Sequence, residues 1–179
     1  VTGGGKGIGK AIATALAMAG AKVMVSDIKL ETAQETADEI GGSAMALDVA
    51  DRSAVDAAMH NTVSRLGALD ILVNNAGLYL GYGGPGEDIT DGMWKALWSV
   101  NVDGVFYCCR AAAKLMKEQG KGGRIINLAS TQAVTPGVGV TYDGSKAAVT
   151  MMTKALALEL APHGINVNAL APGPTWVHG

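Results

Sequence analysis

Aromatic residues are scarce in this sequence and make up only 4% of its 179 residues. A core must therefore be built mainly from alanine, valine, leucine, isoleucine and methionine. Basic residues are not in excess, because the net charge is -2. This argues against nucleic acid as the main partner, since a phosphate backbone is bound by clustered positive charge. No apolar run approaches the roughly 20 residues that a membrane-spanning helix requires, so no membrane partner is expected.

Cysteine is nearly absent, and the only two, Cys108 and Cys109, are adjacent. Neighbours in a helix point in different directions, so we expect no disulfide between them. This pattern suits a reducing compartment and, with no visible signal or transit segment, predicts a cytoplasmic location. The histidines His60, His163 and His178 share no ligand spacing with cysteines or carboxylates, so no metal site is predicted.

Glycine, by contrast, is frequent at 25 residues, and hydrophobic residues account for 49% of the chain. The composition is that of a globular protein, and the length fits one domain, residues 1–179, with a sizeable core. Strands are predicted at 22–26, 43–47, 69–73, 124–128 and 165–170, and helices at 10–19, 30–40, 53–66, 91–119 and 142–161. We expect Asp51 or Ser53 to cap the third helix and the long fourth helix to bend near Gly104.

The alternation of strand and helix predicts an α/β fold with right-handed crossovers. The strands are short and apolar with little in–out alternation, as in a sheet that is covered on both faces. We therefore expect a doubly wound, Rossmann-like parallel sheet in three αβα layers, forming a single domain. Two glycine-containing stretches, 78–90 and 131–141, interrupt this rhythm and predict loops.

A glycine-rich turn stands between the first apolar residues and the first predicted helix. It contains Gly3, Gly5, Gly7 and Gly9, with Lys6 and Ile8 between them. Backbone N–H groups of such a turn can approach a pyrophosphate at the positive end of the helix. The spacing differs from the usual dinucleotide fingerprint, and a plain tight turn is the alternative interpretation.

A carboxylate at the end of the next strand strengthens the nucleotide interpretation. Asp27 follows the glycine turn by about 20 residues, where it can accept hydrogen bonds from ribose hydroxyls. The same charge repels a 2′-phosphate, which favours NAD over NADP. NADP stays an alternative, because Lys6 or Lys29 could meet a phosphate.

Two further strand ends carry polar residues on the same expected edge of the sheet. Asp48 and Val49 are candidates for an adenine contact, and Asp48 as a helix-initiating turn residue is the alternative. Asn75 precedes the small residues Ala76 and Gly77, which would let a ligand approach closely. A polar turn residue without a ligand is the alternative interpretation for Asn75.

Tyr142 and Lys146 lie four residues apart at the start of a predicted helix, on one face and one turn apart. An ammonium so close to a phenol is expected to lower the pKa of Tyr142. A phenol tuned in this way can exchange a proton with an alcohol or carbonyl oxygen. Alone the spacing is a weak signal, because many helices carry such a surface pair by chance.

Together these residues resemble the classical short-chain dehydrogenases/reductases over nearly the whole chain. The motifs stand in family order: Thr2-Gly3-x-x-x-Gly7-x-Gly9, Asp48, Asn74-Asn75-Ala76-Gly77, Asn101, Ser130, Tyr142-x-x-x-Lys146 and Pro172-Gly173. The resemblance implies that Tyr142 is the general acid/base and that Ser130 positions the substrate oxygen. It implies that Lys146 lowers the tyrosine pKa and binds the nicotinamide ribose.

For Asn101 the resemblance implies a bend in its helix and a bound relay water. For Pro172, Gly173 and Thr175 it implies contact with the nicotinamide carboxamide. Two simpler alternatives remain: Ser130 as an ordinary strand-end serine and Asn101 as a structural helix residue. Gln132, Val134 and Val138 would line the substrate pocket and are too generic to name a substrate.

The implied activity is NAD(P)-dependent hydride transfer between nicotinamide and a secondary alcohol or ketone. A catalytically silent nucleotide-binding or assembly protein is the alternative, and a lyase or epimerase fits less well because its glycine turn is usually spaced differently. The helices at 91–119 and 142–161 resemble those through which the family forms dimers and tetramers, so we expect a homo-oligomer such as a homotetramer. Compared with the family, the chain is expected to be truncated at both termini.

Overall fold

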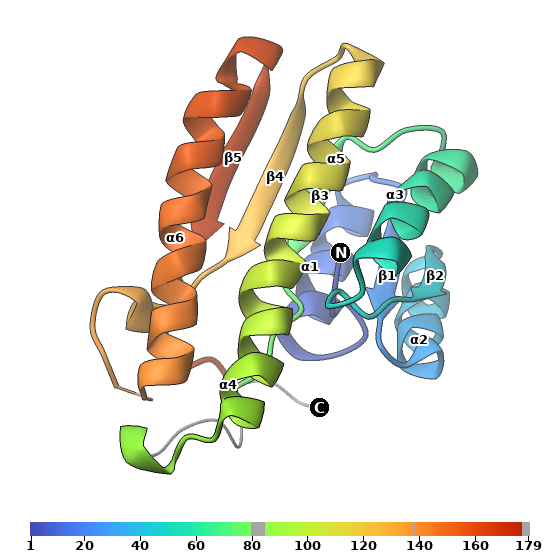
Figure 1. Ribbon diagram of the computed structural model, residues 1–179. Helices are drawn as coiled ribbons and strands as arrows, with labels where there is room; N and C mark the ends of the chain where they lie inside the picture. The colour runs from blue at the N-terminus through green and yellow to red at the C-terminus, as the bar shows by residue number, and fades with distance from the viewer. Residues whose placement is uncertain (80–84, 138, 177–179) are drawn as a thin grey trace.

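In the computed structural model, which describes residues 1–79, 85–137 and 139–176, parallel strands form a sheet with helices packed against both faces (Figure 1). The strands are β1 (Met24–Asp27), β2 (Ser43–Ala46), β3 (Ile71–Asn74), β4 (Gly123–Leu128) and β5 (Ile165–Leu170). The helices are α1 (Gly7–Met18), α2 (Leu30–Ile40), α3 (Arg52–Leu66), α4 (Asp91–Trp98), α5 (Val105–Gln119) and α6 (Val140–Leu160).

The strand order places the first residues of the chain at the centre of the sheet. β1 pairs with β2, and β4 pairs with both β3 and β5, all in parallel. Thr2 joins these two groups through parallel bridges to Ser26 and Asn74. The order is therefore β2, β1, Thr2, β3, β4, β5, which confirms the predicted doubly wound parallel sheet. All carboxyl ends meet at one edge, where open α/β sheets bind ligands.

Two hydrophobic cores lie on opposite faces of the sheet and define the three layers. The larger core includes Met24 and Ile125 and packs against α3, α5 and α6; the smaller includes Val25 and Ala33 and packs under α1 and α2. Met24 and Val25 are neighbours yet face different cores, because successive side chains of a strand point to opposite faces. Val25 is fully buried, which stabilises the fold by roughly 1.5–3 kcal/mol.

Several predicted boundaries were correct, and others were wrong. α2 and β5 have the predicted bounds, and Asp51 is the cap of α3, since its Oδ1 accepts from the backbone N–H groups of Ser53 and Ala54 at 2.8 and 3.1 Å. α1 begins three residues earlier than predicted and ends at Met18, while β1 begins only at Met24. α6 begins two residues earlier than predicted and ends at Leu160.

The long helix predicted at 91–119 is not continuous. A π-helical segment, Ser99–Gly104, separates α4 from α5. Gly104 ends this segment, and a Cβ there would stand 2.7 Å from Val49 Cγ2, so the helix meets the loop after β2 too closely for a side chain. The predicted irregularity near Gly104 is thus a local widening of the helix. Within the described ranges, no helix has the length and apolar character that crossing a membrane takes.

Candidate active site

The glycine turn carries the chain from the sheet into α1. Gly3 and Gly7 have φ angles of 58° and 54°, in the left-handed region that favours glycine. A Cβ on Gly9 would lie 2.0 Å from the Gly3 carbonyl oxygen, so the first turn of α1 packs directly on the turn. The N–H groups of Gly7, Ile8 and Gly9 have no partner inside the helix and are available to an anion.

Asn75 and Thr2 hold this turn against the end of β3. The Asn75 Nδ2 donates to the carbonyl oxygens of Thr2 and Gly3 at 3.1 and 2.8 Å. The Thr2 Oγ1 accepts from the backbone N–H groups of Asn75 and Ala76, both at 3.1 Å. The amide of Asn75 therefore positions the glycine turn, and the two strand ends are tied together through side chains.

A cavity of about 270 Å³ opens at the carboxyl edge of β1, β2 and β3. It brings together predicted cofactor residues from distant parts of the sequence: Gly3, Asp27, Asp48, Val49, Asn75, Ala76 and Gly77. Leu47, Leu78 and Val100 add apolar walls. Carboxylates beside a closely packed glycine turn suit the ribose and phosphates of a dinucleotide, so these residues fit such a cofactor.

The two carboxylates in this cavity also make local hydrogen bonds. The Gly5 N–H donates to Asp27 Oδ2 at 3.1 Å, which ties the glycine turn to the end of β1. The Ala50 N–H donates to Asp48 Oδ1 at 2.9 Å, so Asp48 is also a turn residue ahead of α3. Lys6 and Lys29, the candidates for a phosphate contact, are both exposed.

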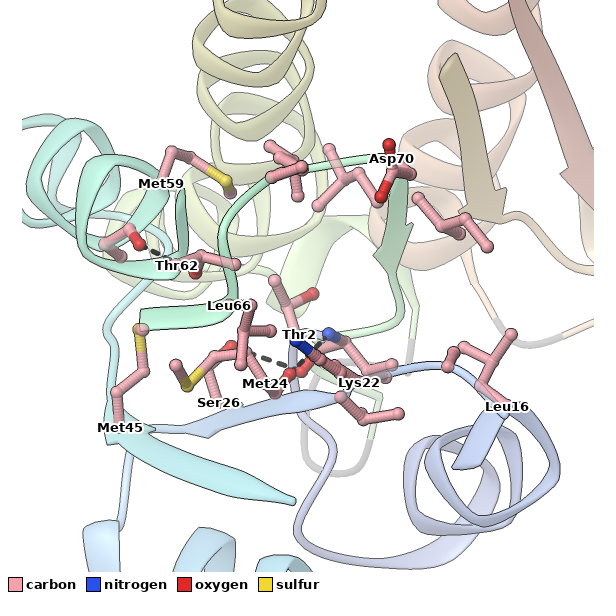
Figure 2. A pocket seen from close by; sticks show the side chains of 18 of the residues that line it. Thr2, Leu16, Lys22, Met24, Ser26, Met45, Met59, Thr62, Leu66 and Asp70 are labelled. Atoms are coloured by element: carbon pink, nitrogen blue, oxygen red, sulfur yellow. Dashed lines mark hydrogen bonds between the residues drawn. The ribbon is translucent and has the colours of Figure 1, made fainter. Parts of the chain in front are cut away.

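The larger cavity of about 400 Å³ lies at the opposite edge of the sheet, between the amino ends of β1 and β3 (Figure 2). Its lining includes Thr2, Lys22, Met24, Met45 and Asp70. The glycine turn beyond Gly3 and the residues Ser130, Tyr142 and Lys146 do not line it. Despite its size, this cavity is therefore not the candidate site, because the side chains expected to act on a substrate do not line it.

Ser130 and Tyr142 meet at the far side of the carboxyl edge. Ser130 follows β4 and is buried, and Tyr142 lies in the first turn of α6 and is partly buried. Burial raises the pKa of Tyr142, while a hydrogen bond with Ser130 lowers it and the nearby Tyr79 and Asp143 raise it further. Tyr79 packs edge-on against the Tyr142 ring, with 5.1 Å between ring centroids.

The prediction of a lowered pKa for Tyr142 was therefore wrong for this structure, in which burial is the largest cause and the pKa is raised. The Lys146 Nζ donates to the Leu128 carbonyl oxygen at 2.8 Å and stands 5.7 Å from the Tyr142 ring centroid. Lys146 is only 6% exposed, and burial lowers its pKa to about 8. A Cβ on Gly77 would be 3.7 Å from this Nζ, so Lys146 also faces the loop after β3.

Asn101 lies in the π-helical segment, fully buried, and connects three parts of the site. Its Oδ1 accepts from the Leu78 N–H at 2.7 Å, and its Nδ2 donates to the Leu78 carbonyl oxygen at 3.0 Å. The same Nδ2 donates to Ser145 Oγ on α6 at 3.2 Å. Asn101 thus fixes the loop after β3 relative to the helix that carries Tyr142 and Lys146.

The segment after β5 lies beside Ser130. The Thr131 N–H donates to the Pro172 carbonyl oxygen at 3.1 Å, and a Cβ on Gly173 would be 3.9 Å from Thr131 Cγ2. Thr175 is exposed, and its hydroxyl donates to the Gly173 carbonyl oxygen at 3.0 Å. Of the generic pocket candidates, Gln132 bonds to Ser130, Val134 is exposed, and Val138 lies outside the described residues.

Sequence reasoning missed three contributors to the site. The Leu128 carbonyl that binds Lys146 is a backbone group, so no residue type in the sequence could have indicated this contact. Tyr79 follows the Asn-Asn-Ala-Gly segment, but only the fold brings it to Tyr142. The bond from Ser130 to Gln132 had a weak signal, since a polar residue two positions after a strand-end serine is a common turn pattern.

The model of the short chain dehydrogenase family matches residues 1–178. The sorbitol dehydrogenase of Cereibacter sphaeroides is 45% identical, over 97% of this chain and 68% of its own length. The galactitol 2-dehydrogenase of Agrobacterium fabrum is 39% identical over the same shares. Among solved structures, the 3-ketoacyl-(acyl-carrier-protein) reductase of Brucella melitensis complexed with NADH is 37% identical with a TM-score of 0.94, over 98% of this chain and 74% of that one. This chain belongs to the short-chain dehydrogenase/reductase family.

Proposed function

We propose that this chain is an NAD-dependent oxidoreductase that interconverts a secondary alcohol and a ketone, with Tyr142 as general acid/base. The observation that carries the proposal is the placement of Ser130 and Tyr142 together beside the buried Lys146, whose Nζ lies 5.7 Å from the Tyr142 ring centroid. A protein that only binds nucleotide does not need a phenol, a hydroxyl and an amine at one point. Their position at the carboxyl edge, on the same edge as the dinucleotide-fitting cavity, supports a reaction on the cofactor.

In the oxidation direction, bound NAD supplies the acceptor for the hydride. Tyr142 takes the hydroxyl proton of the alcohol, for which it must first be deprotonated. Lys146 can hold a charge near the phenolate when protonated, and its pKa of about 8 places it between its two protonation states at a mildly alkaline pH. Ser130 orients the substrate oxygen. Asn101 fixes the position of α6 relative to the loop after β3 through its hydrogen bonds to Ser145 and Leu78.

The cofactor assignment depends on the carboxyl edge of the sheet. The N–H groups of Gly7, Ile8 and Gly9, with Lys6 beside them, would hold the pyrophosphate, and Asp27 would accept the ribose hydroxyls. Asp48 and Val49 would border the adenine, and Asn75, Ala76 and Gly77 would line the middle of the cofactor. Tyr142, Lys146, Pro172, Gly173 and Thr175 would lie at its nicotinamide end, as proposed roles.

Asp27 supports NAD over NADP, because its carboxylate would repel a 2′-phosphate. Lys6 and Lys29 could offer a 2′-phosphate a positive charge, but both side chains are exposed to solvent. We therefore give the Asp27 carboxylate more weight than either lysine. Two relatives are named for polyols, sorbitol and galactitol, which supports a small polyhydroxy substrate for this chain.

The catalytically silent alternative also has an observation in its favour, since the pKa of Tyr142 is raised rather than lowered. Turnover separates the two functions. The wild-type chain is mixed with NAD or NADP and a panel of secondary alcohols and polyols, and nicotinamide absorbance is followed. NADH formation with at least one alcohol supports the oxidoreductase. Tight NAD binding by calorimetry without turnover of any member of the panel would support the silent protein.

We also propose a homo-oligomer, dimer or tetramer, that forms through α5 and α6. Phe106 on α5 and Met151 and Leu158 on α6 are exposed at 42%, 64% and 81%, which leaves apolar surface on both helices. Analytical ultracentrifugation tests this assembly, and a single species of monomer mass would contradict it. Location in the cytoplasm stays a prediction.

A further inference from the structure

The hydroxyl of Ser130 makes two hydrogen bonds with Gln132. Its Oγ donates to Gln132 Oε1 and accepts from the Gln132 backbone N–H at 3.2 Å. A serine hydroxyl has a single proton, so the bond to Gln132 Oε1 uses the only one that Ser130 can donate. The direction that follows is donation from Ser130 to Gln132.

This direction has a consequence for the substrate. To polarise a ketone oxygen, Ser130 must donate its proton to that oxygen, and the proton is already bound by Gln132 Oε1. A simple ketone therefore has to displace the bond to Gln132 and leaves the amide oxygen without the donor it had. The amide oxygen then keeps only the longer bond from the Thr131 hydroxyl, and the loss of its other donor disfavours simple ketones.

A substrate with a second hydroxyl removes this conflict. We propose that Gln132 is a specificity-determining residue that accepts a hydrogen bond from a hydroxyl on the carbon next to the reacting carbon. That hydroxyl replaces Ser130 on the Gln132 Oε1, and the Ser130 proton becomes available to the reacting oxygen. The preferred substrates are then vicinal diols and α-hydroxy ketones. This inference rests on the proposed oxidoreductase function. It adds which substrate group the site recognises, namely the hydroxyl next to the reacting carbon.

The local structure holds Gln132 in place for this task. The residue lies in a short helical turn, Thr131–Ala133, that begins at Ser130, and the turn is anchored by the bond from the Thr131 N–H to the Pro172 carbonyl. The Thr131 hydroxyl also donates to Gln132 Oε1, at 3.3 Å. Gln132 is partly buried and Ser130 is 4% exposed, so the amide oxygen lies at the border between the buried hydroxyl and the surface.

The test compares two substrates that differ by a single hydroxyl, acetoin and 2-butanone. In the reduction of acetoin, the carbonyl carbon receives a hydride from NADH and the carbonyl oxygen receives a proton from Tyr142, which gives butane-2,3-diol and NAD. We expect wild-type kcat/KM to be higher for acetoin by about 3- to 10-fold, the effect of one hydrogen bond between neutral groups. Gln132→Met keeps the side-chain length, removes the acceptor, and should bring this ratio close to one.

Gln34→Met is the matched control, because it makes the same chemical change on the exposed surface of α2. It should leave the ratio at the wild-type value. An unchanged ratio in Gln132→Met, or an equal loss with both ketones, would overturn the proposal. Failure of the proposed function looks different: wild type would reduce neither ketone, or Tyr142→Phe would retain full activity on both.

A measurement on the free protein gives a second readout. In Gln132→Met, Ser130 can donate to the Tyr142 phenolate, so the pKa of Tyr142 should fall relative to wild type. Ultraviolet difference absorbance during a pH titration, with Tyr142→Phe subtracted, isolates this phenol. Lys146, Tyr79 and Asp143 also act on Tyr142 and are the same in both proteins. An unchanged or higher pKa would show that Gln132 does not hold the Ser130 proton.

Discussion

Replacing Lys146 with methionine should change how the stability of the protein depends on pH. Lys146 is 6% exposed, and within the described residues its ammonium donates a hydrogen bond to the Leu128 carbonyl. Its pKa falls from 10.5 to about 8 on folding, through burial. The folded state therefore binds this proton more weakly than the unfolded state does.

The sign of the effect follows from proton linkage. At a pH below 8 both states carry the charge, and the folded state bears the full cost of burying it. Between about pH 8 and pH 10.5 the folded state has lost the proton and the unfolded state has not, so stability rises with pH across this window. A shift of roughly 2.5 pKa units corresponds to about 3 kcal/mol, of which about 2 to 3 kcal/mol is recovered between about pH 7 and pH 10.

Lys146→Met removes this titration and also leaves the Leu128 carbonyl without its donor, which costs about 1–3 kcal/mol. These effects oppose one another near neutral pH, so the absolute stability of the variant is a poor test. The free energy of unfolding from urea melts, wild type minus variant, should instead rise by about 2 to 3 kcal/mol from about pH 7 to pH 10. Ionisation of the buried cysteines, whose pKa values are raised to about 12, is common to both proteins and cancels in the difference.

Lys154→Met is the control, because Lys154 lies on the same helix and is exposed. Its difference curve should be flat. If the Lys146→Met difference is also flat, the ammonium is not buried as the structure shows, and the reasoning about its pKa fails.

Two further predictions concern the cofactor. Gly9→Ala should abolish measurable NAD binding and lower the melting temperature, because its Cβ would stand 2.0 Å from the Gly3 carbonyl oxygen. Gly41→Ala is the control for the loss of a glycine, because no heavy atom lies within 4 Å of a Cβ there. Its φ of 66° adds backbone strain but no steric clash. Wild-type affinity in Gly9→Ala would refute the close packing. Asp27→Asn keeps an acceptor for the Gly5 N–H and removes the charge, so the NADP/NAD affinity ratio, measured by fluorescence titration, should rise roughly tenfold. An unchanged ratio would show that Asp27 does not face the 2′ position.

Where a glycine marked one boundary of an element, that boundary was predictable. α2 ends at Gly41 in the left-handed conformation, and β5 follows Gly164 in the same conformation, so both elements carry a glycine signal. The start of α1 was misjudged because glycine is a poor helix former, by about 1 kcal/mol relative to alanine. Close packing of Gly9 on Gly3 overrides this preference.

Within the site, residue identities were more predictable than their electrostatics. The spacing of Tyr142 and Lys146 places them on one face of α6, and the structure places both beside Ser130 and β4. The spacing could not show that a backbone carbonyl binds the ammonium, or that burial raises the pKa of Tyr142. The bond between Ser130 and Gln132 had only a weak signal in the sequence, because it depends on the conformation of the short helical turn after Ser130.

The most direct measurement of the central claim compares NAD binding and turnover in wild type and Tyr142→Phe. The substitution removes one oxygen and keeps the ring that packs on Tyr79. We predict NAD affinity within about threefold of wild type and a fall in kcat of at least about 100-fold, the effect of losing a positioned acid/base. Turnover by Tyr142→Phe at the wild-type rate would contradict the account.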